Sequence, residues 1–378
     1  MSFLRLLKPL FFALKEDPET SNMSQNESKE FFPLGETLHD EGLKTTKTTR
    51  HCAFCLQDGE FKLCSGCCRR AYCSRKCQVA DWSPSGTGQR HKNWCKYECG
   101  EEDIDFQVVS VPGKGLGIVA RRVIPTKYRI IVEPVYTSPS DHPAINDLEP
   151  ANASLQEKFN LNYFSCDFDK SYVALRICRV NHDCNPNAGL KYCSTSRVQI
   201  LYSYRQIEIG EEITISYKSF SNVESGKRLG RDPELEFLAI KKSLKTKWDI
   251  VCPPDCVCND PAVKQLVLKG RQLTADIHHQ TANRQSSAAL LSLNQLLEIQ
   301  ELIHSPWLDI AKNHYTAFQM AIMTMKTLNQ APEHIRIVHE IFSAVCPHSL
   351  DTLKSEREMK NPKCNLNYLC LERLKRNQ

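Results

Sequence analysis

Cysteine is unevenly distributed along this chain of 378 residues. Of its 19 cysteines, nine lie between Cys52 and Cys99, and a second, smaller group consists of Cys252, Cys256 and Cys258. Cysteine makes up about 5% of the chain, which is below the range of disulfide scaffolds. An odd total that gathers locally indicates metal ligation more than paired disulfides. We therefore expect a reducing compartment, the cytoplasm or the nucleus, where zinc thiolates persist.

The first group shows the spacing of zinc ligands. Zinc takes four sulfur or nitrogen ligands in a tetrahedron, and a spacer of two or three residues lets one turn present two of them. Four such pairs supply eight ligands, enough for two structural zinc ions with no open coordination position. Residues 51–99 are too short and too poor in apolar side chains to fold unaided, so metal must stabilise them. The alternative is a set of unligated thiols. The four pairs are Cys52 and Cys55, Cys64 and Cys67, Cys73 and Cys77, and His91 and Cys95.

The chain after the cysteine-rich segment divides into a β part and a helical part. Short β-branched runs alternate with turn residues between residues 106 and 217, which predicts a mainly β domain. Asp232 and Pro233 then mark the start of a helix that we expect to end near residue 245. Beyond Pro261 the apolar pattern is helical. The predicted strands are 106–111, 117–119, 129–135, 198–204 and 212–216.

The C-terminal helices are separated by Pro306 and Pro332, and we expect them to pack as antiparallel neighbours in a bundle or stack. Each helix has one apolar face, which we interpret as core packing and not as a cofactor site. The predicted face residues are Leu290, Leu293, Leu297 and Leu302 in one helix, Ala311, Tyr315, Phe318, Ile322 and Met325 in the next, and Ile335, Val338, Ile341, Phe342 and Val345 in the last.

The cysteine-rich segment resembles a MYND zinc finger. The resemblance rests on the run from Tyr72 to Trp82 and on the spacing of His91 and Cys95, and it departs from the family in an extra loop at Ser83–Arg90. MYND fingers usually bind partner proteins, often proline-rich peptides, so a peptide partner is implied. Interleaved sites are implied as well. One zinc would take Cys52, Cys55, Cys73 and Cys77, and the other Cys64, Cys67, His91 and Cys95.

Three further motifs follow in order along the chain: 112–117 (PGKGLG), 179–187 (RVNHDCNPN) and 210–217 (GEEITISY). The first alone is weak, because it lacks the helix and spacing of a dinucleotide fingerprint. Together the three resemble the SET domain of protein-lysine methyltransferases. The resemblance implies a knotted β fold that binds S-adenosylmethionine. The implied cofactor contacts are Lys114, Gly115, Leu116, Asn181, His182 and Tyr217.

Tyr217 is the residue that the resemblance places at the substrate-lysine channel, as the catalytic group. A free lysine has a pKa near 10.4, so only about one in a thousand is a neutral nucleophile at pH 7. A narrow apolar channel and a nearby sulfonium both lower that pKa. The Tyr217 hydroxyl could then hold the amine in line with the methyl group. The alternative is an ordinary tyrosine packed at the end of a sheet.

The second cysteine group looks like a post-SET segment. In the family such cysteines share a zinc with the cysteine of the Asn-His motif, so the resemblance implies a third site at Cys184, Cys252, Cys256 and Cys258. Ordinary thiols in a proline-rich loop are the alternative. Asp183 stands where serine is more common, and it could weaken cofactor binding or simply face solvent.

Charge gives little guidance about partners. The finger is basic, which is compatible with nucleic acid, with acidic partners or with a solvated surface. Ligating thiols are deprotonated, so the three implied zinc sites carry enough negative charge to offset the formal +5. The net charge is therefore poor evidence for nucleic-acid binding. The basic residues of the finger are Arg69, Arg70, Arg75, Lys76, Arg90 and Lys92.

We thus expect an α+β multidomain protein with a zinc-stabilised finger, a knotted SET domain and a C-terminal helical domain. Arg5, Lys8, Pro9 and Lys15 interrupt the apolar start, which favours an amphipathic tail over a signal peptide. No apolar run approaches the roughly 18 residues of a membrane span. The expected segments are a disordered or amphipathic tail (1–50), the finger (51–99), the SET domain (104–218), a post-SET zinc segment (219–260) and the helical domain (261–378).

The expected function is S-adenosylmethionine-dependent methylation of lysine in a histone or another protein, by a monomer. Two alternatives come from other classes. A catalytically weak scaffold would act through contacts of the finger and helices with other proteins. A regulator that binds nucleic acid would use the arginines of the finger and would lose affinity with salt.

Overall fold

The computed structural model describes residues 50–67, 69–82, 91–95, 97, 99–166, 170–217 and 233–368. All of them belong to one compact unit, Thr48–Gln378. The tail expected before residue 50, the loop Ser83–Arg90 and the helix cap Asp232 lie outside the described residues. No helix in the described ranges is both long and apolar enough to cross a membrane.

The N-terminal finger consists of very short elements around sulfur atoms. Two-residue strands form two antiparallel pairs, and two short helices follow. The buried centre is made of Cys52, Cys64 and Tyr72, with the other cysteines packed against it. This centre is too small to hold the segment together by apolar burial. The elements are β1 (Arg50–His51), β2 (Asp58–Gly59), β3 (Lys62–Leu63), β4 (Ala71–Tyr72), α1 (Arg75–Trp82) and α2 (His91–Trp94).

Two small sheets form the β region. A four-stranded sheet has the order β10-β13-β6-β5, in which β10 runs parallel to β13 and the other pairs are antiparallel. A three-stranded antiparallel sheet has the order β11-β12-β7, and β8 and β9 form a hairpin. The strands are β5 (Phe106–Val111), β6 (Gly115–Ala120), β7 (Arg129–Pro134), β8 (Phe164–Cys166), β9 (Lys170–Tyr172), β10 (Asn181–His182), β11 (Ala188–Cys193), β12 (Val198–Ser203) and β13 (Glu212–Ile215).

The five predicted strands are present, with ends that differ by one or two residues. Strands β8 to β11 were not predicted. Strand β11 begins with Ala188 and Gly189, which have little intrinsic preference for strands. Glycine is needed there because a side chain at 189 would lie 2.2 Å from the Tyr204 hydroxyl. Tertiary packing, and not local preference, therefore determines this strand.

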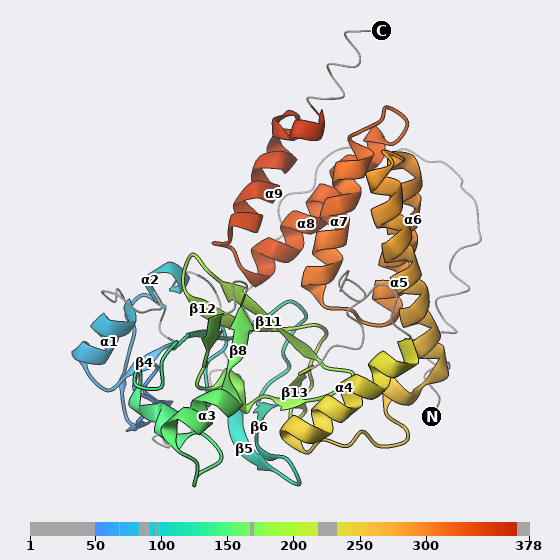
Figure 1. Cartoon of the computed structure of the whole chain (residues 1–378). Helices are drawn as coiled ribbons and strands as arrows, with labels where there is room; N and C mark the ends of the chain where they lie inside the picture. The colour runs from blue at the N-terminus through green and yellow to red at the C-terminus, as the bar shows by residue number, and fades with distance from the viewer. Residues whose placement is uncertain are drawn as a thin grey trace, which may run out of the picture. The chain divides into compact units, whose positions relative to one another are not determined.

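The helices lie mainly in the C-terminal part of the chain (Figure 1). Helix α3 lies within the β region and begins with a capping box in which Ser154 and Glu157 each bind the other's backbone N–H. Helix α4 ends at Trp248, three residues later than expected. The helices are α3 (Leu155–Asn162), α4 (Pro233–Trp248), α5 (Pro261–Ala282), α6 (Ser286–Leu302), α7 (Trp307–Ala321), α8 (Ala331–Val345) and α9 (Leu350–Lys360).

The predicted apolar faces of these helices are largely correct. Helix α8 buries all five predicted residues. Met325 is wrong, because α7 ends at Ala321 and leaves Met325 exposed in the following turn. Leu302 is also more exposed than expected, because it is the last residue of α6. Both deviations occur at or just beyond the C-terminal end of a helix.

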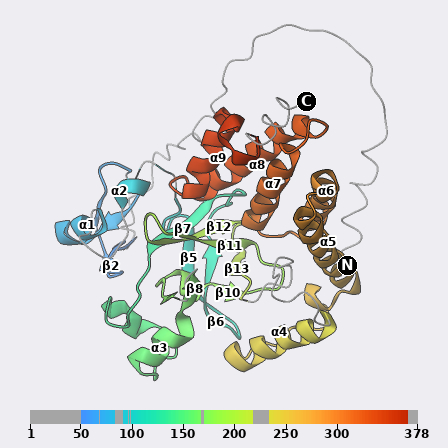
Figure 2. The ribbon, with the colours of Figure 1, turned by 45° about the horizontal axis from the view of Figure 1, so that its top comes forward.

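The helical region packs against the three-stranded sheet. One apolar core contains Phe318 of α7 and Ile341 of α8 together with Val198, Ile200 and Tyr202 of β12. Both views show α8 and α9 beside β12 (Figures 1 and 2). A shared core of this kind makes separate unfolding of the helices and the sheet unfavourable.

Candidate functional site

The structure brings all twelve predicted metal ligands together in the predicted groups. Within each group the ligand atoms, one per residue, lie within 4.8 Å of one another. The sequence alone did not pair Cys184 with residues about seventy positions later; that grouping came from the family resemblance. The groups are Cys52, Cys55, Cys73 and Cys77; Cys64, Cys67, His91 and Cys95; and Cys184, Cys252, Cys256 and Cys258.

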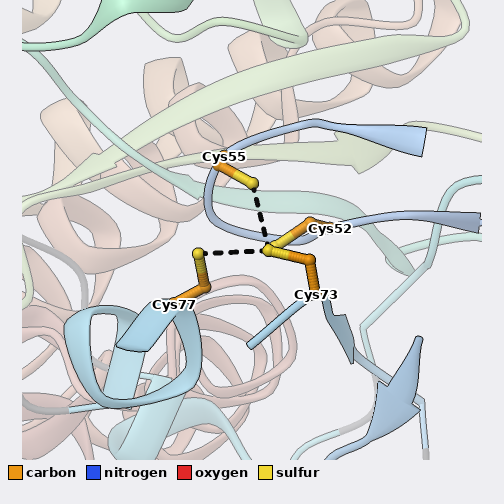
Figure 3. Close-up of side chains that lie close together, drawn as sticks. All are labelled: Cys52, Cys55, Cys73 and Cys77. Carbon is orange, nitrogen blue, oxygen red and sulfur yellow. Dashed lines mark hydrogen bonds between the residues drawn. The ribbon is translucent and has the colours of Figure 1, made fainter. Parts of the chain in front are cut away.

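The first finger group has tetrahedral dimensions. The Sγ atom of Cys73 lies 3.5 Å from that of Cys55 and 3.4 Å from that of Cys77. Figure 3 shows the sulfur atoms of all four residues directed toward one another. Thiolates bound at about 2.3 Å in a tetrahedron are about 3.8 Å apart. The donor set and its spacing therefore fit a four-coordinate zinc ion.

The second finger group uses one imidazole nitrogen. His91 Nε2 lies 3.4 Å from Cys64 Sγ and 3.5 Å from Cys67 Sγ. Burial and, to a smaller extent, the nearby Arg70 charge lower the pKa of His91 to about 4, although Asp81 opposes them. The ring is therefore neutral at physiological pH, which is the form that binds a metal. This set also fits zinc.

Two arginines attach the finger to the β region. The buried Arg70 donates to Asp81 Oδ2 at 2.8 Å and to the Val132 carbonyl of β7 at 2.6 Å. Arg69 donates to Asp105 Oδ2 at 2.6 Å. Both guanidinium groups thus serve intramolecular contacts. The basic surface expected from the sequence is correspondingly smaller, since Arg70 is buried.

The third group lies beside the Asn-His motif. Cys184 Sγ is 3.6 Å from Cys252 Sγ, and His182 Nε2 is 3.3 Å from Cys184 Sγ. The main-chain N–H of Tyr217 donates to His182 Nδ1, so the ring proton must be on Nε2 and point at the Cys184 sulfur. An N–H donor to a sulfur ligand is an outer-shell contact typical of metal sites.

A cavity of about 480 Å³ lies at the turn between β5 and β6. It is lined by four of the six predicted cofactor residues, namely Lys114, Gly115, Leu116 and Asn181. Cys178 and Arg179 complete the wall next to Asn181, and burial raises the pKa of Cys178 to about 12. The volume is in the range of cofactor and ligand sites.

The His182 ring does not line this cavity. It is buried between Tyr217 and the third cysteine group. The contact of His182 with a cofactor stays a prediction. Asp183 is exposed and accepts from the Asn185 N–H, so it faces solvent in a turn.

Tyr217 is half-buried and is not among the residues that line this cavity. Its hydroxyl donates to the Val180 carbonyl over 2.8 Å, and its ring centroid lies 5.4 Å from that of His182 and 5.0 Å from that of Trp248. Burial raises the pKa of Tyr217 to about 12, so the hydroxyl stays protonated at neutral pH. Since the hydroxyl proton is donated to the Val180 carbonyl, the Tyr217 oxygen can only accept hydrogen bonds from other neighbours.

Comparison with known families agrees with the cysteine-rich finger and with the site around the Asn-His motif. The MYND finger family matches residues 52–95, and the SET domain family matches residues 115–218. The chain carries a MYND finger followed by a SET domain. The SET match includes Asn181, His182 and Tyr217, whereas Cys252, Cys256 and Cys258 lie beyond it.

Two proteins of Schizosaccharomyces pombe are similar to parts of this chain. Histone-lysine N-methyltransferase set5 is 31% identical over 132 residues, which are 30% of this chain and 41% of that protein. SET domain and MYND-type zinc finger protein 6 is 24% identical over 200 residues, 46% of this chain and 39% of that protein. The chain thus matches about two fifths of the length of each relative.

Among solved structures, the Neurospora SET domain protein DIM-5, a histone lysine methyltransferase, is 15% identical with a TM-score of 0.22. That likeness covers 30% of this chain and 52% of the other. A score at this level does not establish a shared arrangement of the whole chain.

Several residues at the SET domain site are not among the predicted site residues, including Asp147, Glu149, Asn162 and Arg179 of the cavity wall. Trp248 packs on Tyr217, Cys178 lines the cavity, and Glu212 holds both Lys114 and Asn181. Glu212 is part of the quoted 210–217 motif, and Cys178 directly precedes the Asn-His motif, so the motifs point to both residues. No motif points to Trp248, because only tertiary packing brings it to Tyr217.

A second cavity, of about 170 Å³, lies on the other side of the third cysteine group. Its wall includes Phe237 of α4, Val267 of α5 and Leu190 of β11. None of the predicted cofactor residues lines it. Cys184 and Cys258 of the third cysteine group also line it, so this cavity adjoins that proposed metal site.

Proposed function

We propose that this protein is an S-adenosylmethionine-dependent protein-lysine N-methyltransferase whose MYND finger binds a peptide partner. The observation that supports this most strongly is the convergence of all three SET motifs on one place. The glycine turn and Asn181 line one cavity, and the protonated hydroxyl of Tyr217 donates to the carbonyl of Val180, the residue next to Asn181.

The glycine turn is suited to a ligand that approaches the backbone. Gly115 has a positive φ of 78°, and no atom lies within 4 Å of the position that a side chain would occupy. The turn therefore offers open main chain on the cavity side, with Lys114 and Leu116 on either side of it. These residues and the Asn181 amide are the groups that we propose to hold the cofactor, which supplies an electrophilic methyl group when bound.

Tyr217 is proposed to orient the substrate amine. Its hydroxyl oxygen keeps lone pairs free because the proton is donated to Val180. An acceptor of this kind directs an amine N–H and places its nitrogen for in-line attack. Trp248 and the buried His182 exclude water from the other side of the phenol ring, and a dry site favours the neutral lysine.

Zinc is proposed at all three cysteine groups, with a structural role. The finger ions would replace the apolar core that the finger lacks. The third ion would join the Asn-His motif to the segment from Cys252 to Cys258, so that Trp248 stays against Tyr217. This assignment makes the 219–260 stretch the equivalent of a post-SET segment, and the 104–218 stretch a SET domain with that family's knot.

Several parts of the proposal do not rest on the geometry of the site. Histone is the proposed substrate because set5 is named for that activity, and another protein substrate fits the site equally well. We propose a nuclear or cytoplasmic location because zinc thiolates persist in a reducing compartment. We further propose that the protein is a monomer.

The test is transfer of a radiolabelled methyl group from S-adenosylmethionine to proteins of a cell extract. Wild-type protein should label at least one band, and Tyr217→Phe should reduce the labelling by about a hundredfold or more, in the range of a lost catalytic group. Leu366→Ala, at an exposed position in the helical region, is the matched control and should label like wild type. Absence of labelling together with absence of cofactor binding would support the scaffold alternative.

A further inference from the structure

We propose that Glu212 is a positioning residue that sets the orientation of the Asn181 amide and thereby directs its carbonyl oxygen to the cofactor. The proposal rests on the proposed function. Glu212 is the first residue of β13, which pairs with β6 next to the glycine turn. None of the comparisons assigns it a role.

The orientation of the Asn181 amide follows from its neighbours. Asn181 Nδ2 lies 2.8 Å from Glu212 Oε1 and 3.1 Å from the Leu116 carbonyl oxygen. A carboxylate and a carbonyl are acceptors only, so the NH₂ group must face them. Both of its protons are used, and Oδ1 points the other way. None of the described residues donates to Oδ1.

The carboxylate itself is held from a second side. Lys114 Nζ donates to Glu212 Oε2 at 2.7 Å, so each carboxylate oxygen has a different partner. The site also leaves the amide little room. A side chain at Gly117 would come within 2.7 Å of Asn181 Nδ2 and 3.0 Å of Glu212 Oε1. Glycine at 117 is what allows the carboxylate and the amide to meet.

The consequence concerns what Asn181 offers to the cavity. Lys114, Leu116 and Asn181 all line it. An amide fixed by Glu212 and Leu116 presents an acceptor, which suits the ammonium group of an amino-acid ligand. Without Glu212 only Leu116 holds the amide, and the group can rotate to present NH₂, which repels an ammonium. Glu212 therefore contributes to affinity without touching the ligand.

The experiment measures S-adenosylmethionine binding by calorimetry to the full chain and to Glu212→Ala, Asn181→Ala and the double variant. Glu212→Ala should raise Kd about tenfold, as expected for a hydrogen bond to a charged group. In the Asn181→Ala background the same change should raise Kd by less than about twofold, because Glu212 acts through Asn181. The KM for the protein substrate should stay unchanged.

Glu212→Gln distinguishes positioning from direct charge attraction and guards against a misfolded alanine variant. Its amide oxygen can still accept from Asn181, so we expect a Kd within about threefold of wild type. The neighbouring Glu211→Gln is the control and should leave Kd unchanged, since Glu211 binds Arg205 and Asn187 instead.

The outcomes separate this inference from the proposed function. If wild type binds the cofactor but Glu212→Ala does so equally well, the positioning role is wrong and the proposed function stands. Full additivity in the double variant, or a Gln variant as weak as the Ala variant, also overturns it. If wild type does not bind S-adenosylmethionine, the proposed function fails and this inference fails with it.

Discussion

The main-chain N–H of Tyr217 donates a hydrogen bond to Nδ1 of His182 over 3.1 Å. The other ring nitrogen lies 3.3 Å from the sulfur of Cys184. One neutral imidazole thus connects the proposed catalytic tyrosine to a proposed zinc ligand. Because the ring is buried and its pKa is lowered by that burial, it keeps a single proton and one fixed tautomer.

We predict that two substitutions of His182 reduce methyl transfer to different extents. His182→Asn retains an oxygen that can accept from Tyr217 but does not reach Cys184, and it should reduce methyl transfer by about tenfold. His182→Phe removes both contacts and should reduce transfer further and lower the bound zinc. Transfer assays paired with zinc analysis check this. Equal activity of the two variants, with zinc unchanged, would contradict the proposed link.

Metal content is the second prediction. Elemental analysis of the purified chain should find three zinc ions, because there are three tetrahedral donor sets. Cys64→Ser and Cys256→Ser should each lower the content to about two. Cys364 lies outside the three groups, so Cys364→Ser is the matched control and should keep all three. A zinc content that does not respond to Cys256→Ser would exclude the third site.

The third prediction concerns the attachment of the finger. Asp81→Asn removes the nearer of two carboxylates beside the buried Arg70, while Arg70 still reaches Val132 and Glu101 Oε1 stays 3.5 Å from its Nε. Because the guanidinium keeps one ionic partner, we expect a loss of about 1.5–3 kcal/mol in the free energy of unfolding, as for a hydrogen bond to a charged group. Urea unfolding measures it. Arg75→Met, at an exposed position of the same finger, should change stability by less than about 0.5 kcal/mol; a similar loss in both variants would contradict the account.

The fourth prediction is a pH dependence at Glu211. Partial burial alone raises the pKa of this carboxyl, but hydrogen bonds from Arg205, from the Glu208 N–H and from Asn187 outweigh it and lower the pKa to about 2. A carboxyl with a lower pKa in the folded state stabilises the fold above its unfolded value of about 4.3, and this contribution is lost as the pH falls below that value.

The measurement is the unfolding free energy of wild type and Glu211→Gln between pH 7 and pH 2. We expect wild type to be more stable at pH 7 by on the order of 1–2 kcal/mol, allowing for solvent screening, and the difference to shrink steadily below about pH 5. A stability difference that grows toward acid pH would contradict the lowered pKa of Glu211 in the folded state.

The twelve proposed metal ligands could be predicted because most of them come in pairs close in sequence. A two-residue spacer such as that between Cys52 and Cys55 is typical of zinc ligands and can be recognised in the local sequence. The strands at 106–111 and 129–134 were recognisable for the same reason, since their β-branched runs are continuous. Strand β10, which is two residues long, exists only because Asn181 and His182 pair with β13. No local sequence pattern predicts a strand of this kind.

The side-chain orientations at the site were beyond the sequence. The family resemblance named His182 as a cofactor contact, but it could not say that the ring turns toward Cys184. It likewise could not reveal that Trp248 packs on Tyr217, because the two are separated by a helix and meet only in the folded chain. The sequence predicts candidate site residues, and packing determines which way their side chains face.

The most direct test of the central claim is tandem mass spectrometry of substrate proteins after incubation with the purified chain and S-adenosylmethionine that carries a deuterated methyl group. The account predicts deuterated methyl groups on lysine side chains with wild type, and their loss with Tyr217→Phe. Labelled groups confined to residues other than lysine, or equal labelling of lysine by both proteins, would contradict it.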